Sequence, residues 1–129
     1  MAIPRDILQN NPCLSKWSIL TAYRGSISHG MYMPKKDPNS IDDKDVIGLC
    51  IPPVDYYYGL KQFGSRGTKE IKKDEWDIVV FEYIKAIRLL QKGNPNILNL
   101  LWLEPQHYIK ITEAGQLLLD NRGLFVAKH

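Results

Sequence analysis

Residues 76–93 constrain the fold more than any other part of the chain, because their hydrophobic pattern changes from that of a strand to that of a helix. Residues 76–80 (Trp-Asp-Ile-Val-Val) form an apolar run typical of a buried strand. From residue 81 onwards the large apolar side chains recur every three or four positions, until Gly93 ends the pattern. We therefore expect a strand followed by an amphipathic helix, whose apolar positions include Phe81, Ile84, Ile87 and Leu90.

Two further strands are predicted upstream of this one. Residues 16–24 alternate larger apolar or aromatic side chains with smaller neighbours, and Gly25-Ser26 then breaks the strand into a tight turn. Residues 43–51 form an apolar strand that Pro52-Pro53 stops. Between these strands, residues 27–41 contain too many glycines and prolines for a regular element of any length.

The other expected elements are short. They are a short helix at 56–58, a mobile loop at 64–70, a helix over 97–103 after a turn at 94–96, a strand at 107–111 and a helix that starts from Thr112 as its N-cap. No internal repeat is visible.

The composition is that of an ordinary globular chain. Its 129 residues suit a single domain, and a formal net charge of +3 is compatible with a polyanionic partner without requiring one. Cys13 and Cys50 match no metal-ligand spacing, and we expect reduced, buried thiols. The first residues lack the apolar core of a signal peptide, and no apolar stretch is long enough to cross a bilayer. We therefore expect a cytoplasmic protein.

Asp43 and Asp45 carry the chemistry of the second predicted strand. Side chains at alternate positions of a strand point the same way, so both carboxylates project from one face or edge. Two like charges this close repel each other unless a cation neutralises them. Hard oxygen ligands of this kind suit Mg²⁺ or Mn²⁺, which substrate phosphates then complete.

Two other strand ends contribute to the same predicted site. The Gly25-Ser26 turn lets the backbone approach a phosphate closely, while its N–H groups and the Ser26 hydroxyl donate hydrogen bonds. Asp77 opens the apolar half of the third strand, and it would join Asp45 if the two strands are neighbours. Arg24 flanks the turn and is a candidate for steering a triphosphate, as is Lys44 beside the acidic pair.

Each of these residues also has a purely structural interpretation. Asp42, Asp43 and Asp45 alone would indicate a solvated acidic turn, and Asp74 or Glu75 could replace Asp77 after a small register error. Isolated basic residues near acidic ones are usually surface pairs, and Glu82 suits the field at a helix N-terminus. Tyr56, Tyr57, Tyr58 and Trp102 are candidates for base stacking, with core packing as the alternative. His29 is a candidate general base. Candidates for nucleic-acid contacts, with a solvated loop as the alternative, are Arg66, Lys69, Lys72 and Lys73.

The ordered set of Gly25-Ser26, Asp43-Lys44-Asp45 and Asp77 resembles the nucleotidyltransferase superfamily that includes DNA polymerase beta. Longer strings resemble, more narrowly, the RNA-repair-pathway (RlaP-type) group, in which a Gly-Asn-Pro-Asn turn and a Leu-Leu-Trp run follow the catalytic core. These strings are RGSISHG, DDKDVIGLCIPP, DIVVFEYIKAIRLLQKGNPNILNLLWLEP and NRGLFVAKH. The resemblance covers roughly residues 17–129.

The resemblance implies an α/β (α+β) fold, with a small mixed sheet and packed helices, like the polymerase-beta palm. It implies a single nucleotidyltransferase domain over residues 1–129, with a C-terminal helical extension of the relatives missing. It also implies phosphate contacts at Gly25 and Ser26, and Mg²⁺ or Mn²⁺ ligation by the catalytic carboxylates Asp43, Asp45 and Asp77. The chain departs from the pattern in its longer spacing between turn and acidic pair, in Lys44, and in Ile47, where relatives often have Arg.

The implied reaction moves a nucleoside monophosphate from an NTP, such as ATP, to a hydroxyl and releases pyrophosphate. An RNA end is the first expected acceptor, and a protein hydroxyl is the alternative within the family. Two other classes stay open: a nucleotide- or nucleic-acid-binding module without turnover, and a subunit that associates with itself or with a partner chain. The apolar residues at 124–126 motivate the last of these.

Overall fold

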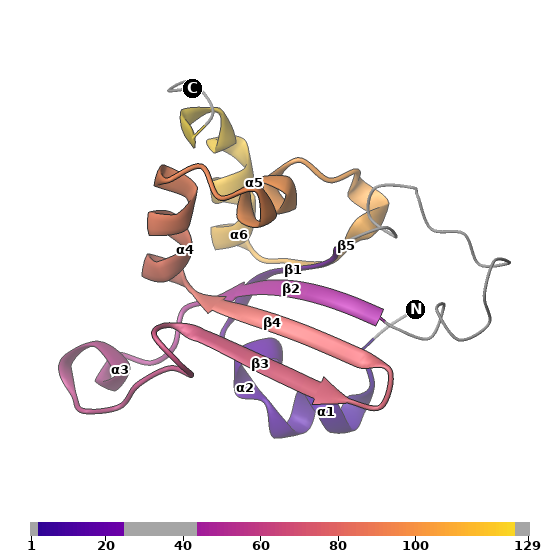
Figure 1. Ribbon diagram of the computed structural model, residues 1–129, viewed down its shortest axis with the longest axis vertical. Coiled ribbons are helices and arrows are strands. Elements are labelled where there is room, and N and C mark those ends of the chain that lie inside the picture. The colour runs from indigo at the N-terminus through magenta and orange to yellow at the C-terminus, as the bar shows by residue number, and fades with distance from the viewer. Residues whose placement is uncertain (1–2, 25–43, 126–129) are drawn as a thin grey trace, which may run out of the picture.

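A five-stranded mixed sheet with helices on both faces forms the protein, in a computed structural model that describes residues 3–24 and 44–125 (Figure 1). The strand order is β3-β4-β2-β1-β5. The strands are β1 (Ser18–Tyr23), β2 (Lys44–Cys50), β3 (Thr68–Lys73), β4 (Trp76–Glu82) and β5 (Tyr108–Ile111). The helices are α1 (Arg5–Asn10), α2 (Pro12–Ser15), α3 (Asp55–Tyr58), α4 (Tyr83–Gln91), α5 (Pro95–Leu101) and α6 (Glu113–Asp120), with 3-10 turns η2 (Pro105–His107) and η3 (Arg122–Phe125). This architecture confirms the expected α+β fold with a small mixed sheet.

The parallel pairing of β2 with β4 occupies the centre of the sheet. Every other strand pair is antiparallel, so β2 and β4 are the one pair of neighbouring strands in the sheet that start at the same end. Both strands are rich in β-branched and other apolar residues, as expected for strands buried on two faces. The two strands pair without a register shift from Lys44 opposite Trp76 to Cys50 opposite Glu82.

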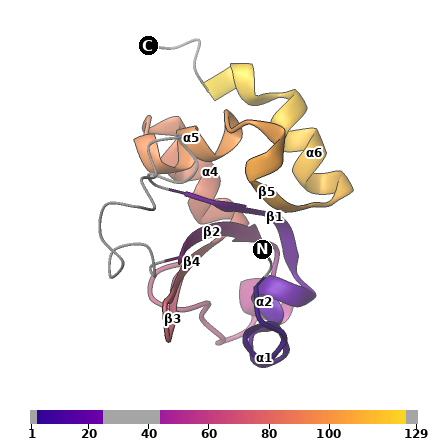
Figure 2. The same ribbon diagram turned by 90° about the vertical axis from the view of Figure 1, so that its right-hand side faces the viewer.

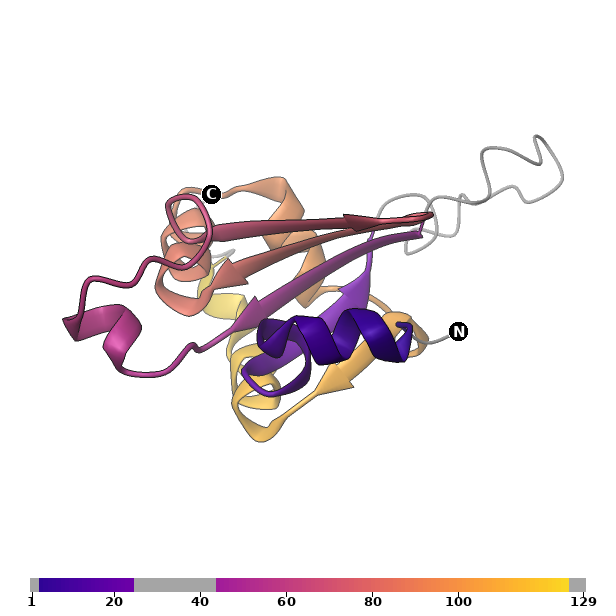
Figure 3. The same ribbon diagram turned by 90° about the horizontal axis from the view of Figure 1, so that it is seen from below.

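Two hydrophobic cores lie on opposite faces of the sheet, because alternate residues of each strand point to opposite sides. Ile47 and Leu49 of β2 pack with residues of α4, α5 and α6, and we call this side the α4–α6 face. Val46 and Cys50 pack with residues of α1 and α2 on the other side. Figure 2 shows the two helical layers with the sheet between them, and Figure 3, seen from below, shows the N-terminal helices in front of the strands.

Side-chain caps fix the starts of three helices. Glu82 accepts hydrogen bonds from the backbone N–H groups of Ile84 and Lys85 at the start of α4. Asn94 caps α5 in the same way, and Thr112 accepts from the N–H of Gly115 in α6. The sequence-based assignments of Glu82 to a helix start and of Thr112 to an N-cap are thus confirmed.

The expectation for residues 64–70 is wrong in its second half. Residues 68–73 form β3, an edge strand with charged side chains, rather than part of a loop. Its only large apolar residue is Ile71, so the alternation that normally identifies a strand is nearly invisible. Charged edge strands of this kind protect a sheet from pairing with other chains. The third strand is also longer than expected, since β4 continues through Phe81 to Glu82.

The elements near the N-terminus form the helical layer on the side of the sheet opposite the α4–α6 face. The sequence pattern did not predict α1 and α2, which are only six and four residues long. Ile7, Cys13 and Leu14 are their buried side chains, and these help to close the core beneath β2 and β4. The short helix expected at 56–58 is confirmed as α3. None of the helices in the described ranges is long and apolar enough to span a membrane.

Gly115 gives a direct test of how α6 packs on β1. A Cβ atom at this position would lie 2.0 Å from the backbone oxygen of Ile19, so Gly115→Ala forces the helix away from the strand. We expect a loss of about 2 kcal/mol in the free energy of unfolding, measured by urea denaturation, despite the better helix propensity of alanine. The matched control is Gly123→Ala, where nothing lies within 4 Å of the new Cβ, and its stability should stay within about 0.5 kcal/mol of wild type. Equal effects of the two substitutions would contradict the packing described here.

Candidate functional site

The parallel register of the central strands brings Asp45 and Asp77 side by side. Asp45 of β2 is the direct Cα partner of Asp77 of β4. Neighbouring strands lie about 4.8 Å apart, and paired residues of parallel strands point to the same face. Both residues are half-buried. Two carboxylates are therefore held next to each other on one face of the sheet.

This acidic pair lies on the α4–α6 face, because Asp45 alternates in phase with Ile47 and Leu49 of that core. It occupies the starts of β2 and β4, whereas α4 begins directly after the other end of β4. In Figure 1 the starts of both strands lie at the end of the sheet away from α4. The core helices are therefore anchored at the opposite end of these two strands.

Two basic residues extend the acidic pair into a row across four strands. Lys72 of β3 is the Cα partner of Asp77, and the N–H of Arg24, just after β1, donates to the carbonyl oxygen of Asp45 at 3.1 Å. The order along the row is Lys72, Asp77, Asp45, Arg24. Although Lys72 and Asp77 are direct cross-strand neighbours, they form no ion pair in the described part of the chain. The row thus combines two acceptors suited to a cation with two donors suited to an anion.

The structure separates Asp77 from the two acidic residues that might have replaced it. Glu75 forms an ion pair with Lys44 at 3.1 Å, and this contact holds the pKa of its carboxyl below the usual range. The amino group of Lys44 also lies 5.8 Å from the ring centre of Trp76, on the face away from the acidic pair. Asp74 adopts a positive φ of 56° in the turn between β3 and β4. Of these three acidic residues, only Asp77 is paired with Asp45 in the sheet.

Two buried side-chain nitrogens occur at the same end of the sheet as this row. The Nε of Arg24 and the Nδ1 of His107 are both buried without a hydrogen-bond partner among the described residues. His107 directly precedes β5, whose first residue, Tyr108, pairs with Ala22 of β1 two positions before Arg24. Buried donors without a partner cost free energy, so they indicate where a further polar group belongs. Sequence reasoning missed His107, because nothing in its local pattern distinguishes it from a loop histidine.

Three predicted site residues lie outside the described ranges. Gly25, Ser26 and Asp43 belong to this group, so their roles stay predictions, and the same holds for His29. Within residues 3–24 and 44–125, no group of three metal-ligating side chains gathers in one place. The two carboxylates that are described, Asp45 and Asp77, are hard oxygen donors on one face and fit a divalent cation with water or phosphate completing its shell.

The aromatic candidates have structural contacts. The ring of Tyr56 packs edge-on against Trp17 and Phe63, with ring centres 5.5 and 6.5 Å away, so it belongs to the core. Trp102 follows α5 and is half exposed, and the guanidinium of Arg122 lies 4.6 Å from its ring centre. Neither residue is in the charged row.

The two cysteines are structural as well. Cys13 and Cys50 are buried free thiols in the core beneath the sheet, as the sequence predicted. Burial raises the pKa of both thiols, so they stay protonated at neutral pH.

Of the comparisons with known proteins, one gives a match. No curated protein and no solved structure gives a significant match to the chain. A family match covers residues 16–129, which include all five strands, the charged row and the helices of the α4–α6 face. That family is described as the RNA repair pathway DNA polymerase beta family, RlaP, and the chain belongs to it.

Proposed function

We propose that this protein is a metal-dependent nucleotidyltransferase, which moves a nucleoside monophosphate from an NTP to a hydroxyl group. The observation that supports this most strongly is the pairing of Asp45 with Asp77 at the start of the two parallel strands. Membership of a polymerase-beta-like family suggests a nucleotidyltransferase-like role. The same two carboxylates are the ones that the ordered sequence motif selects.

The proposed roles follow from charge and position. Asp45 and Asp77 would hold Mg²⁺ or Mn²⁺ together with Asp43, which lies outside the described residues. When bound, the metal lowers the pKa of the acceptor hydroxyl and neutralises charge on the phosphates. Arg24, with its buried Nε, binds phosphate oxygens beside the Gly25-Ser26 turn.

Lys72 is an addition to the site, since the sequence pattern placed it only among candidate nucleic-acid contacts and not beside the acidic pair. It neighbours Asp77 on the side of the row away from Arg24, and its side chain is exposed. Its positive charge suits the triphosphate or the departing pyrophosphate. Basic groups therefore occupy both ends of the acidic pair.

The acceptor is proposed from the family. Its description as an RNA repair pathway family favours an RNA end as the hydroxyl acceptor, with ATP among the candidate donors. Reduced, buried cysteines are consistent with a cytoplasmic location.

Association with a second copy or a partner chain is a separate proposal. It rests on the large apolar side chains that are exposed around the last helices, Trp102, Leu117 and Leu124. Light scattering would show a stable oligomer if this surface is covered, and a monomer would exclude self-association.

The catalytic role of the acidic pair is tested by Asp45→Asn and Asp77→Asn. Each substitution keeps the side-chain shape and removes a metal-binding charge. Removal of a residue that only hydrogen-bonds to a metal ligand typically lowers metal affinity or activity by about 10–100-fold. Because Asp45 and Asp77 are proposed as the ligands themselves, we expect pyrophosphate release from labelled NTPs to fall by more than about 100-fold. The matched control is Asp74→Asn, in the same hairpin and at a positive φ that asparagine tolerates, and it should keep full activity.

Metal removal provides the complementary measurement. Chelation with EDTA should abolish pyrophosphate release, and added Mg²⁺ or Mn²⁺ should restore it. Turnover that survives EDTA, or that is equal in Asp45→Asn and wild type, would contradict the enzyme assignment. If NTP binds without release for any acceptor, the chain is a binding module without turnover.

The acidic pair should also cost stability when metal is absent, because two neighbouring carboxylates repel each other. In EDTA we expect Asp77→Asn to raise the Tm by a few degrees, corresponding to about 1 kcal/mol. Addition of Mn²⁺ should raise the Tm of the wild type and leave that of Asp77→Asn unchanged. A Tm for Asp77→Asn that equals the wild-type value in EDTA and rises equally with Mn²⁺ would show that this residue binds no metal.

A further inference from the structure

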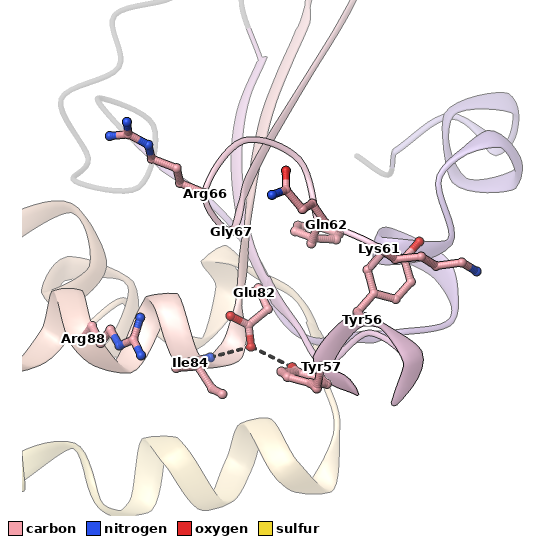
Figure 4. A pocket seen from close by; sticks show the side chains of 10 residues that line it. Tyr56, Tyr57, Lys61, Gln62, Arg66, Gly67, Glu82, Ile84 and Arg88 are labelled. Atoms are coloured by element: carbon pink, nitrogen blue, oxygen red, sulfur yellow. Dashed lines mark hydrogen bonds between the residues drawn. The ribbon is translucent and has the colours of Figure 1, made fainter. Parts of the chain in front are cut away.

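A cavity of about 300 Å³ lies at the other end of the central strands from the acidic pair. Its walls come from three places: α3 and the residues after it, the turn that leads into β3, and the first two turns of α4 (Figure 4). Glu82 lies in this wall and ends β4, five positions beyond Asp77. At about 3.3 Å per residue, the two places are separated by roughly 16 Å along the strand. The cavity is therefore distinct from the charged row.

A tight turn presents Arg66 at the edge of this cavity. Gly64, Arg66 and Gly67 all have positive φ, and the N–H of Gly67 donates to the carbonyl of Phe63 at 3.1 Å. The carbonyl of Gly67 in turn accepts from the N–H of Glu82 at 2.8 Å. A Cβ at Gly64 would lie 2.2 Å from the oxygen of Thr68, so the close approach requires glycine. A positive φ at a residue other than glycine is uncommon, and here the surrounding turn fixes Arg66 in that conformation.

A second arginine lines the cavity from helix α4. Arg88 lies on α4, and Figure 4 shows it below Glu82 while Arg66 comes from the loop above. Among the described residues, neither guanidinium group forms an ion pair. Lys61 differs, because it is paired with Asp55 at 2.9 Å and extends away from Glu82. The cavity thus has two arginine side chains with their donor groups unused.

The acidic residue of the cavity is already satisfied. The carboxylate of Glu82 accepts from the hydroxyl of Tyr57 at 2.6 Å and from the backbone N–H groups of Ile84 and Lys85 at 2.7 and 3.1 Å. Burial and this carboxylate raise the pKa of Tyr57, so its hydroxyl remains a donor to Glu82 at neutral pH. Three donors therefore offset the charge of Glu82, and the arginines are the charged groups of the cavity that have no ion pair among the described residues.

We propose that this cavity binds a phosphate group of a single-stranded nucleic acid. The bound strand is the acceptor, and the cavity holds it at a position distant from the end that reacts. The planar fork of arginine matches phosphate oxygens better than any other side chain. The neighbouring helix α3 adds aromatic rings for bases, since Tyr57 and Tyr58 are 38% and 87% exposed. A polymer that carries a phosphate at every nucleotide is long enough to contact both this cavity and the acidic pair, which lie roughly 16 Å apart along the strand. The proposal rests on the proposed function for the identity of the bound strand as the acceptor.

Binding of a fluorescently labelled single-stranded RNA, followed by anisotropy in EDTA, tests this proposal without requiring catalysis. We expect the double variant Arg66→Gln/Arg88→Gln to bind about tenfold more weakly, since two charge-assisted hydrogen-bonding groups are lost. The slope of log K against log salt should also fall by about 0.7, because the contact with one phosphate is lost. Arg66→Lys/Arg88→Lys keeps both charges, so it should retain the salt slope while binding more weakly than wild type.

The matched control is Arg5→Gln/Lys16→Gln, which removes the same charge from two exposed residues that do not line the cavity. It should bind RNA within about twofold of wild type, because long-range charge effects are screened at ordinary salt. Equal weakening by the control and by Arg66→Gln/Arg88→Gln would overturn the proposal, as would unchanged binding in the latter. Circular dichroism confirms that each variant is folded before binding is compared.

Two further outcomes separate this site from its alternatives. If ATP displaces the RNA and the arginine variants lose ATP binding to the same extent, the phosphate belongs to a free nucleotide and the nucleic-acid assignment is wrong. If Asp45→Asn abolishes pyrophosphate release while RNA affinity is unchanged by substitution of Arg66 and Arg88, the proposed function stands and this cavity proposal fails. RNA binding that depends on both arginines in a protein without NTP turnover would support the cavity and sink the enzyme assignment.

Discussion

The unshifted parallel pairing of β2 with β4 is the constraint on which the rest of the structure depends. Because the two strands start at the same end of the sheet, their second residues, Asp45 and Asp77, meet on one face. A slip of one residue in either strand would turn a carboxylate into the opposite core and an apolar side chain out of it. Burial of Val46 and Ile78 on one face and Ile47 on the other therefore fixes the register, and the register positions the acidic pair. Core packing and the candidate chemistry are consequences of the same pairing.

The same two strands also separate two kinds of polar surface. At their starts lie the acidic pair and the flanking cations Arg24 and Lys72, which suit a metal and the phosphates of a nucleotide. At their ends, the Glu82 cap begins α4 and the cavity with Arg66 and Arg88 opens beside it. One end is thus suited to the reaction and the other to holding a strand. A polymeric acceptor that extends along the sheet would contact both ends, whereas a small acceptor is too short to do so.

Local patterns were sufficient to predict the elements that bury apolar residues. β2, β4 and α4 follow from their apolar runs and from the change of period after residue 80, and Asp77 follows from its place ahead of such a run. β3 escaped prediction because its charged side chains carry almost no alternation, and α1 and α2 because they are too short for a helical period. The row across the sheet could not be predicted, since Lys72 and His107 reach their positions only through strand order. Gly25, Ser26 and Asp43 lie outside the described ranges, so their part of the candidate site stays a prediction.

A crystal structure of the protein with Mn²⁺ and a non-hydrolysable NTP tests the central claim most directly, because the anomalous signal of the metal marks its position. The account predicts that Mn²⁺ would be held by the carboxylates of Asp45 and Asp77, with the triphosphate on the side of Arg24. Mn²⁺ bound elsewhere, with neither carboxylate in contact with it, would contradict the account. That result would leave the pairing of β2 with β4 as described and would exclude its proposed role in metal binding.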